Sequence, residues 1–136
     1  MIALLLSMML QDAPALGAIG RQALPAAGCA AYLWDNARRR RLVAMATAEP
    51  ARLRLSLDGR TLDLGRSAGT GAAGFGFPGV AEYRGEGVLA VLDMAAEARA
   101  DLQGGGVVPA GTLRIERPGR DVLVAPVAGL IGCAGR

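Results

Sequence analysis

The 136 residues of the chain are enough for one domain with a hydrophobic core and little more. The net charge is +3, and a charge this small gives no reason to expect a nucleic-acid partner. The absence of histidine excludes Ser–His and Cys–His nucleophile pairs as well as histidine-based zinc sites. We therefore expect a non-enzymatic protein with no metal site and no cofactor.

Residues 1–15 have the pattern of a secretory signal. An apolar run over residues 2–10, broken by one serine, is followed by the small-residue triplet Ala13-Pro14-Ala15. Because the run is too short for a stable membrane anchor, we expect cleavage after Ala15, no transmembrane span, and a periplasmic or secreted protein. No lysine or arginine precedes the run, so a buried first strand or helix is the alternative.

Residues 16–28, with several glycines and a proline, predict an irregular lead-in to a single β-rich domain over residues 29–136. In the oxidising compartment that an export signal implies, Cys29 and Cys133 should form a disulfide. Two buried free thiols in a cytosolic protein are one alternative. A lipid anchor at Cys29 is another, because residues 26–29, Ala-Ala-Gly-Cys, resemble a relaxed bacterial lipobox.

Two strands are expected at 29–34 and 42–47, joined by a turn that carries Arg38, Arg39, Arg40 and Arg41. Four guanidinium groups in a row could form a basic patch that binds phosphate or an acidic surface. Aromatic residues, which accompany single-strand nucleic-acid binding, are not interleaved with these arginines. A solvated turn is the first expectation, and the acidic surface of a protein or membrane is the partner to expect if the run binds.

The clearest local pattern lies at 52–64, where apolar residues alternate with period two on both sides of Asp58-Gly59. Asp-Gly is favoured in two-residue turns whose central residues both have positive φ. The resulting hairpin sets Arg54 opposite Asp63 on one face. Its other face carries two apolar pairs, Leu53 with Leu64 and Leu55 with Leu62.

Two further hairpins follow, 80–84 with 88–93 about Gly85-Glu86, and 112–117 with 121–127 about Pro118-Gly119. Pro-Gly fits a type II turn, and Pro126 implies that the last strand is an edge or ends there. Loops are expected at 66–79 and 104–111, and the alanine-rich stretch 95–102 suits either a strand or a helix.

These segments and the many turn residues predict a mainly β fold. We expect a single small antiparallel barrel or sandwich of about seven or eight short strands, with room for one short helix. Within it, the glycine-rich loop at 66–79 is the first candidate for binding, through Ser67, Thr70, Phe75 and Phe77. A loop packed over the barrel end is the default expectation, whereas a mobile loop would present its two phenylalanines to solvent.

The small-residue loop Ser-Ala-Gly-Thr-Gly-Ala at 67–72, in a short exported barrel with a terminal disulfide, resembles the periplasmic inhibitors of c-type lysozyme. In that family a Ser-Gly-rich loop, closely followed by a basic residue and a tyrosine, enters the lysozyme cleft. The present chain departs from this pattern, because Tyr83 and Arg84 come about a dozen residues later. The resemblance covers this loop and the general shape.

The missing catalytic residue types and the special loops together favour a non-enzymatic binding module of the cell envelope. Its partner would be a protein or another envelope component, bound through the 66–79 loop or the arginine turn. One alternative is a small-ligand carrier whose barrel interior is made roomy by the alanines at 96–100. Another is a protein similar to the lysozyme inhibitors.

Overall fold

The structure, a computed structural model, describes residues 15–36, 40–102 and 104–134, so nearly all of the predicted signal segment lies outside it. The described residues form ten strands and no helix. The strands are β1 Leu16–Gly17, β2 Gly28–Asp35, β3 Leu42–Thr47, β4 Arg52–Leu57, β5 Arg60–Thr70, β6 Val80–Gly85, β7 Val88–Met94, β8 Glu97–Ala98, β9 Gly106–Glu116 and β10 Leu123–Ala134.

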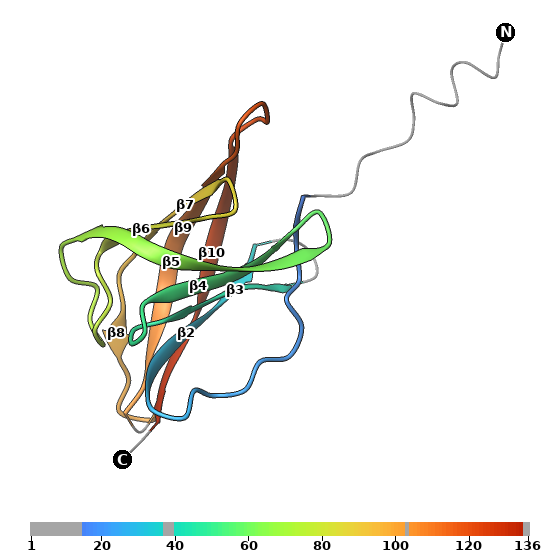
Figure 1. Cartoon of the computed structure of the whole chain (residues 1–136). Helices are drawn as coiled ribbons and strands as arrows, with labels where there is room; N and C mark the ends of the chain where they lie inside the picture. The colour runs from blue at the N-terminus through green and yellow to red at the C-terminus, as the bar shows by residue number, and fades with distance from the viewer. Residues whose placement is uncertain (1–14, 37–39, 103, 135–136) are drawn as a thin grey trace, which may run out of the picture.

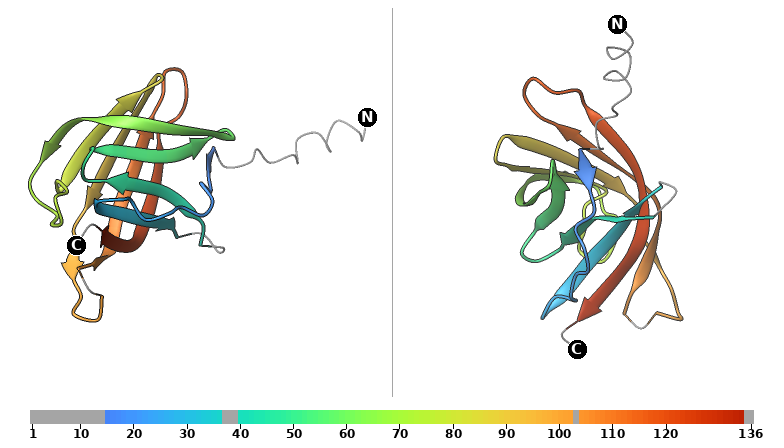
Figure 2. Two further views of the ribbon diagram at one scale, coloured as in Figure 1. Left: turned by 60° about the horizontal axis from the view of Figure 1, so that its bottom comes forward. Right: turned by 90° about the vertical axis from the view of Figure 1, so that its right-hand side faces the viewer.

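Eight of these strands close into an antiparallel barrel (Figure 1). β2, β3, β4, β5, β6, β7, β9 and β10 each pair with the next strand along the chain, and β10 returns to pair with β2. This is an up-and-down barrel, and it confirms the predicted mainly β class. The two-residue strands β1 and β8 add to the edges of β4 and β9, and the β9–β10 hairpin extends beyond the β6–β7 hairpin (Figure 2).

The hairpin predicted at 52–64 is confirmed in its register. Asp58 and Gly59 have φ of 51° and 81°, and the predicted leucine pairs face each other across β4 and β5. Arg54 lies opposite Asp63, with 2.7 Å between Nε and Oδ1. The predicted Pro118-Gly119 turn also forms, because Gly119 has φ of 70° and the Arg120 N–H donates to the Arg117 carbonyl.

The barrel interior is filled by rows of paired side chains that run from strand to strand. One row joins Leu33, Ala44, Leu55 and Leu62, and another joins Ala81, Leu92, Leu113 and Ala125. Each row sets alanine among leucines, so large side chains project into the space that small ones leave. This pattern explains how a chain with only 4% aromatic residues builds a packed core.

The disulfide between Cys29 and Cys133 is present. The two cysteines face each other in the ladder between β2 and β10, the pair of strands that closes the barrel. This arrangement confirms the predicted pairing. It excludes the predicted alternatives for these residues, because a sulfur in a disulfide is neither a free thiol nor available for a lipid thioether.

Several predicted boundaries were wrong, mostly where glycine was taken as a sign of a loop. β5 continues through Thr70, and β9 begins at Gly106 and runs through the expected loop at 104–111. A Cβ at Gly106 would lie 2.7 Å from Cζ of Phe75, so this glycine permits close packing within a strand. The lead-in at 16–28, predicted to be irregular throughout, contains β1.

Three further outcomes concern the second half of the chain. Glu86 and Gly87, with φ of 50° and 76°, form the turn that was predicted one residue earlier. Within 95–102 only Glu97–Ala98 is regular, and it is a strand. Pro126 lies at an edge position, as one of the two alternatives predicted, because it comes just before the pairing with β2 begins and has only β9 as a neighbour. The other alternative was wrong, since β10 continues to Ala134.

Replacing both Cys29 and Cys133 by serine should lower the free energy of unfolding by about 4 to 5 kcal/mol, because the crosslink spans 104 residues of otherwise unconstrained unfolded chain. Urea unfolding of the oxidised chain and of the double variant measures the difference. The dithiothreitol-reduced wild type serves as control and should match the variant. A loss below about 1 kcal/mol would show that the unfolded chain gains little freedom when the crosslink is removed.

Candidate functional site

The second half of β5 forms an open strand edge. β4 pairs with β5 from Arg60 to Gly65, whereas β6 pairs with it from Gly65 to Thr70. The Arg66 N–H still donates to the Ala51 carbonyl, so residues 67–70 are the part with a neighbouring strand on one side only, within the described chain. All four residues are exposed. We call residues 67–70 the β5 edge.

The β5 edge is small and uncharged, with the sequence Ser-Ala-Gly-Thr. Its pairing with β6 contains a bulge between Arg66 and Ala68, and the Ser67 hydroxyl donates to the Glu82 carbonyl at 3.4 Å. Two of the predicted binding residues, Ser67 and Thr70, therefore lie at an accessible backbone edge rather than in an irregular loop.

The loop that follows, at 71–79, is folded back over the end of the barrel. The Ala73 N–H donates to the Phe77 carbonyl at 2.8 Å, the Met94 N–H to the Gly79 carbonyl at 2.9 Å, and the Ala96 N–H to the Ala73 carbonyl at 3.2 Å. The first bond closes the loop on itself, and the other two tie it to the chain around β7 and β8. The loop therefore holds the end of β5 in place.

Phe75 and Phe77 do not face solvent, as expected for a loop packed over the barrel end. Phe77 is only 3% exposed and belongs to the core, and Phe75 packs against it in a partly buried position near Gly106. Covering the open end of the barrel removes both rings from water, which is the favourable arrangement for large apolar groups. Phe75 and Phe77 therefore support the β5 edge indirectly, because they anchor the loop that follows it.

The arginine run does not form one uniform patch. Arg38 and Arg39 lie outside the described residues. Arg41 is committed to Asp35, since its Nη2 and Nε donate to Asp35 Oδ2 at 2.8 and 3.0 Å and its backbone N–H donates to Oδ1 at 3.0 Å. Nη2 also donates to the Leu16 carbonyl at 3.2 Å. The prediction of Arg41 as a binding residue is corrected to a structural role, while Arg40 is exposed.

Removing the Arg41 side chain should destabilise the fold. Arg41→Ala leaves the carboxylate of Asp35, which is only 9% exposed, without its guanidinium partner, and we expect a loss of about 2 kcal/mol in the free energy of unfolding. The exposed pair between Arg60 and Glu86 provides the control, because Arg60→Ala should cost less than about 0.5 kcal/mol. Equal losses in chemical denaturation would contradict the structural role of Arg41.

A small-ligand carrier would need empty space inside the barrel, whereas the interior of this barrel holds packed side chains. Tyr83 and several leucines on the inner face are less than 2% exposed. Of residues 96–100, expected to widen the interior, Ala96 is partly buried against the core and 97–100 are exposed. The Tyr83 hydroxyl is buried and has no hydrogen-bond partner among the described residues. Burial raises the pKa of Tyr83, and the charge of Arg66 opposes this in part.

Tyr83→Phe should raise the free energy of unfolding by about 1 kcal/mol at neutral pH, because it removes a buried hydroxyl that makes no hydrogen bond. Since the pKa of Tyr83 is higher in the folded state, its ionisation favours unfolding as the pH rises above the ordinary value of 10.0. The variant should therefore lose less stability than the wild type above that pH. Urea unfolding at pH 7 and at alkaline pH measures both effects, and a destabilised variant would show that the hydroxyl has a partner in solution.

The two acidic groups whose pKa values are shifted within the described segments are both held by arginines. Hydrogen bonds from Arg54 and Arg117 lower the pKa of Asp63 and of Asp58, and both carboxylates belong to ion pairs at hairpins. No group of three or more Cys, Asp or Glu residues in the described segments could hold a metal ion. No helix long and apolar enough to cross a membrane occurs in those segments.

In comparisons with known proteins, no family model, curated protein or solved structure matches the chain. The candidate site is therefore defined by the geometry of the β5 edge and of the loop that supports it.

Proposed function

We propose that the chain is a non-enzymatic binding module of the cell envelope, and that it docks a partner protein on the β5 edge. The observation that supports this is an exposed strand edge with no charge and no proline at 67–70. Soluble β proteins usually protect such an edge with charged residues, proline, a bulge or a covering segment, and of these the β5 edge has a bulge at Ser67. An exposed edge without charge or proline can instead accept an extended segment of another protein as an additional strand.

The surroundings of the edge support this use. The 71–79 loop is fixed by backbone hydrogen bonds to Met94 and Ala96, so the edge is held in a defined position before a partner arrives. Less conformational entropy is then lost when the partner binds. The disulfide fits an oxidising compartment and, together with the predicted signal, supports a periplasmic or secreted location.

Site-specific cross-linking tests the docking proposal. A photo-reactive phenylalanine analogue is placed at Ser67, at Thr70 and, as the matched control, at the exposed Thr61 of the same strand. The protein is expressed with export to the periplasm. We expect one and the same protein to be cross-linked from Ser67 and Thr70 and not from Thr61. Cross-links from all three positions, or from none, would overturn the proposal.

Lysozyme inhibition is the second candidate function, because the exposed 67–70 segment is the one that resembles the cleft-binding loop of the periplasmic inhibitors. Purified c-type lysozyme is assayed with the wild type, with Ser67→Arg and Thr70→Arg, and with Thr61→Arg as control. Inhibition by the wild type and the control, and at least tenfold weaker inhibition by the other two variants, would support this function. A wild type that leaves lysozyme fully active would exclude it.

A further inference from the structure

β10 is apolar on both of its faces. Its inward side chains belong to the core, as expected for a barrel strand. The outward positions, which normally carry polar residues in an antiparallel sheet exposed to water, are also apolar. Together with the residue before the strand they form what we call the β10 stripe, Val122, Val124, Pro126, Ala128 and Leu130.

The β10 stripe gathers much of the exposed apolar surface of the described chain. Val122, Val124 and Leu130 are 52%, 61% and 46% exposed. A fourth exposed apolar residue, Leu24 of the lead-in, lies 3.1 Å from the Cβ position of Gly132, near the end of the same strand. Exposed apolar residues that occur singly need no explanation, but a contiguous line of them indicates a binding surface.

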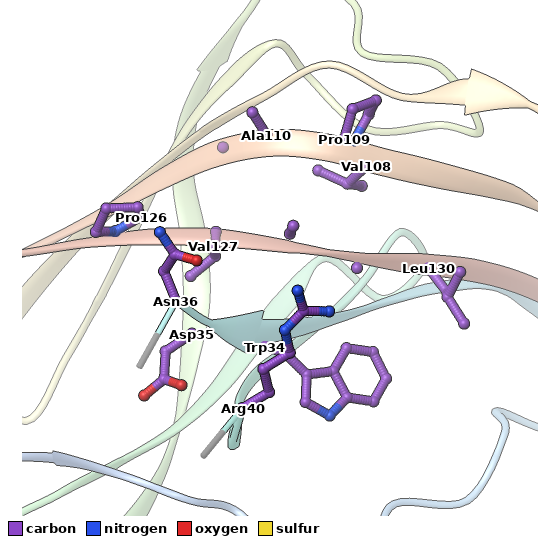
Figure 3. Close-up of a pocket in the computed structure, with 13 residues that line it drawn as sticks. Trp34, Asp35, Asn36, Arg40, Val108, Pro109, Ala110, Pro126, Val127 and Leu130 are labelled. Atoms are coloured by element: carbon purple, nitrogen blue, oxygen red, sulfur yellow. The ribbon is translucent and has the colours of Figure 1, made fainter. Parts of the chain in front are cut away.

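A groove of about 640 Å³ lies along Pro126, Ala128 and Leu130 of the β10 stripe, and we call it the outer groove. Trp34 and Arg40 lie on one side of it, and Pro109 and Ala110 of β9 lie on the other (Figure 3). Gly129 lines the groove at a bulge in the pairing of β9 with β10. A volume of this size is typical of sites for small organic molecules.

The polar groups of the outer groove favour an anion. Arg40 is exposed and forms no ion pair with any described residue, whereas most other described arginines contact a carboxylate. Asp35 also lines the groove, but its carboxylate is bound by Arg41. The outer groove therefore combines an apolar lining with one uncompensated positive charge.

We propose that the outer groove binds a fatty-acid carboxylate, with the acyl chain along the β10 stripe and the carboxylate at Arg40. An extended peptide fits less well, because the β10 backbone at Gly129 and Leu130 is already paired with both β2 and β9. The peptide's own N–H and C=O groups would then lie unpaired over an apolar surface, at a cost in free energy. An acyl chain has no such groups.

A second copy of the chain is also less suitable as the occupant. In a twofold dimer each stripe would meet the same stripe of the other copy, so the surface would have to carry charges of both signs that pair across the interface. The β10 stripe contains no carboxylate that could receive Arg40 of the other copy. A fatty acid supplies both the apolar chain and the negative charge that the outer groove lacks.

Trp34 is the only tryptophan of the chain, so its fluorescence reports on the outer groove alone. Dodecanoate is titrated into the full chain, and a brominated fatty acid is used as quencher. We expect saturable binding with a blue shift of the emission. Arg40→Gln should weaken binding about tenfold through loss of a charge-assisted contact, and Leu130→Glu at least tenfold through loss of apolar contact and added repulsion.

Val80→Glu is the matched control, because Val80 is also exposed and apolar but lies on β6, away from β10. It should bind dodecanoate like the wild type, and circular dichroism checks that all variants are folded. Dodecyltrimethylammonium, which has the same chain and a positive head group, should bind at least tenfold more weakly than dodecanoate. Equal binding of the two amphiphiles, an unaffected Leu130→Glu variant, or a dimer that buries the β10 stripe in sedimentation would each overturn the proposal.

Discussion

The pairing of β2 with β10 is the constraint on which the rest of the structure depends. These are the first and last strands of the barrel, and without their contact the sheet would be open at both edges. The approach is so close that a Cβ on Gly129 would overlap the carbonyl oxygen of Tyr32. Position 129 therefore requires glycine, and the disulfide between Cys29 and Cys133 fastens the same pair of strands near the chain's carboxyl end.

Closing the barrel in this way also shapes its outer surface. Where β10 bends around Gly129, its pairing with β9 is irregular, and the outer groove lies at that irregularity. The lead-in covers the neighbouring part of the outside, with the Tyr32 hydroxyl donating to the Ala23 carbonyl and Leu24 over Gly132. The uncovered part of the β2–β10 surface thus results from the way in which the first and last strands of the barrel pair.

Local features of the fold could be predicted from the sequence, whereas of the non-local contacts only the disulfide could, because Cys29 and Cys133 are the two cysteines of the chain. The Asp58-Gly59 hairpin was predicted to the residue because turn chemistry and strand alternation specify the same register. Gly106 and Gly129 were not recognised as strand residues, because the close contact that requires glycine at each position is made with a segment distant in the sequence. Arg41 could not be separated from its neighbours in the run either, since its role depends on Asp35 and Leu16.

The two proposed sites differ in how far the sequence could predict them. Ser67 and Thr70 stand out in one continuous small-residue segment, whereas the outer groove is assembled from β2, β9 and β10 and the turn after β2. The sequence feature that pointed to the outer groove was the continuous apolar run at 122–131. Because apolar and polar residues do not alternate in this run, the sequence does not tell which of its side chains face outward. In the closed barrel three strands separate β5 from β10 in either direction. The β5 edge and the outer groove therefore lie on opposite walls, and a partner on one leaves the other accessible.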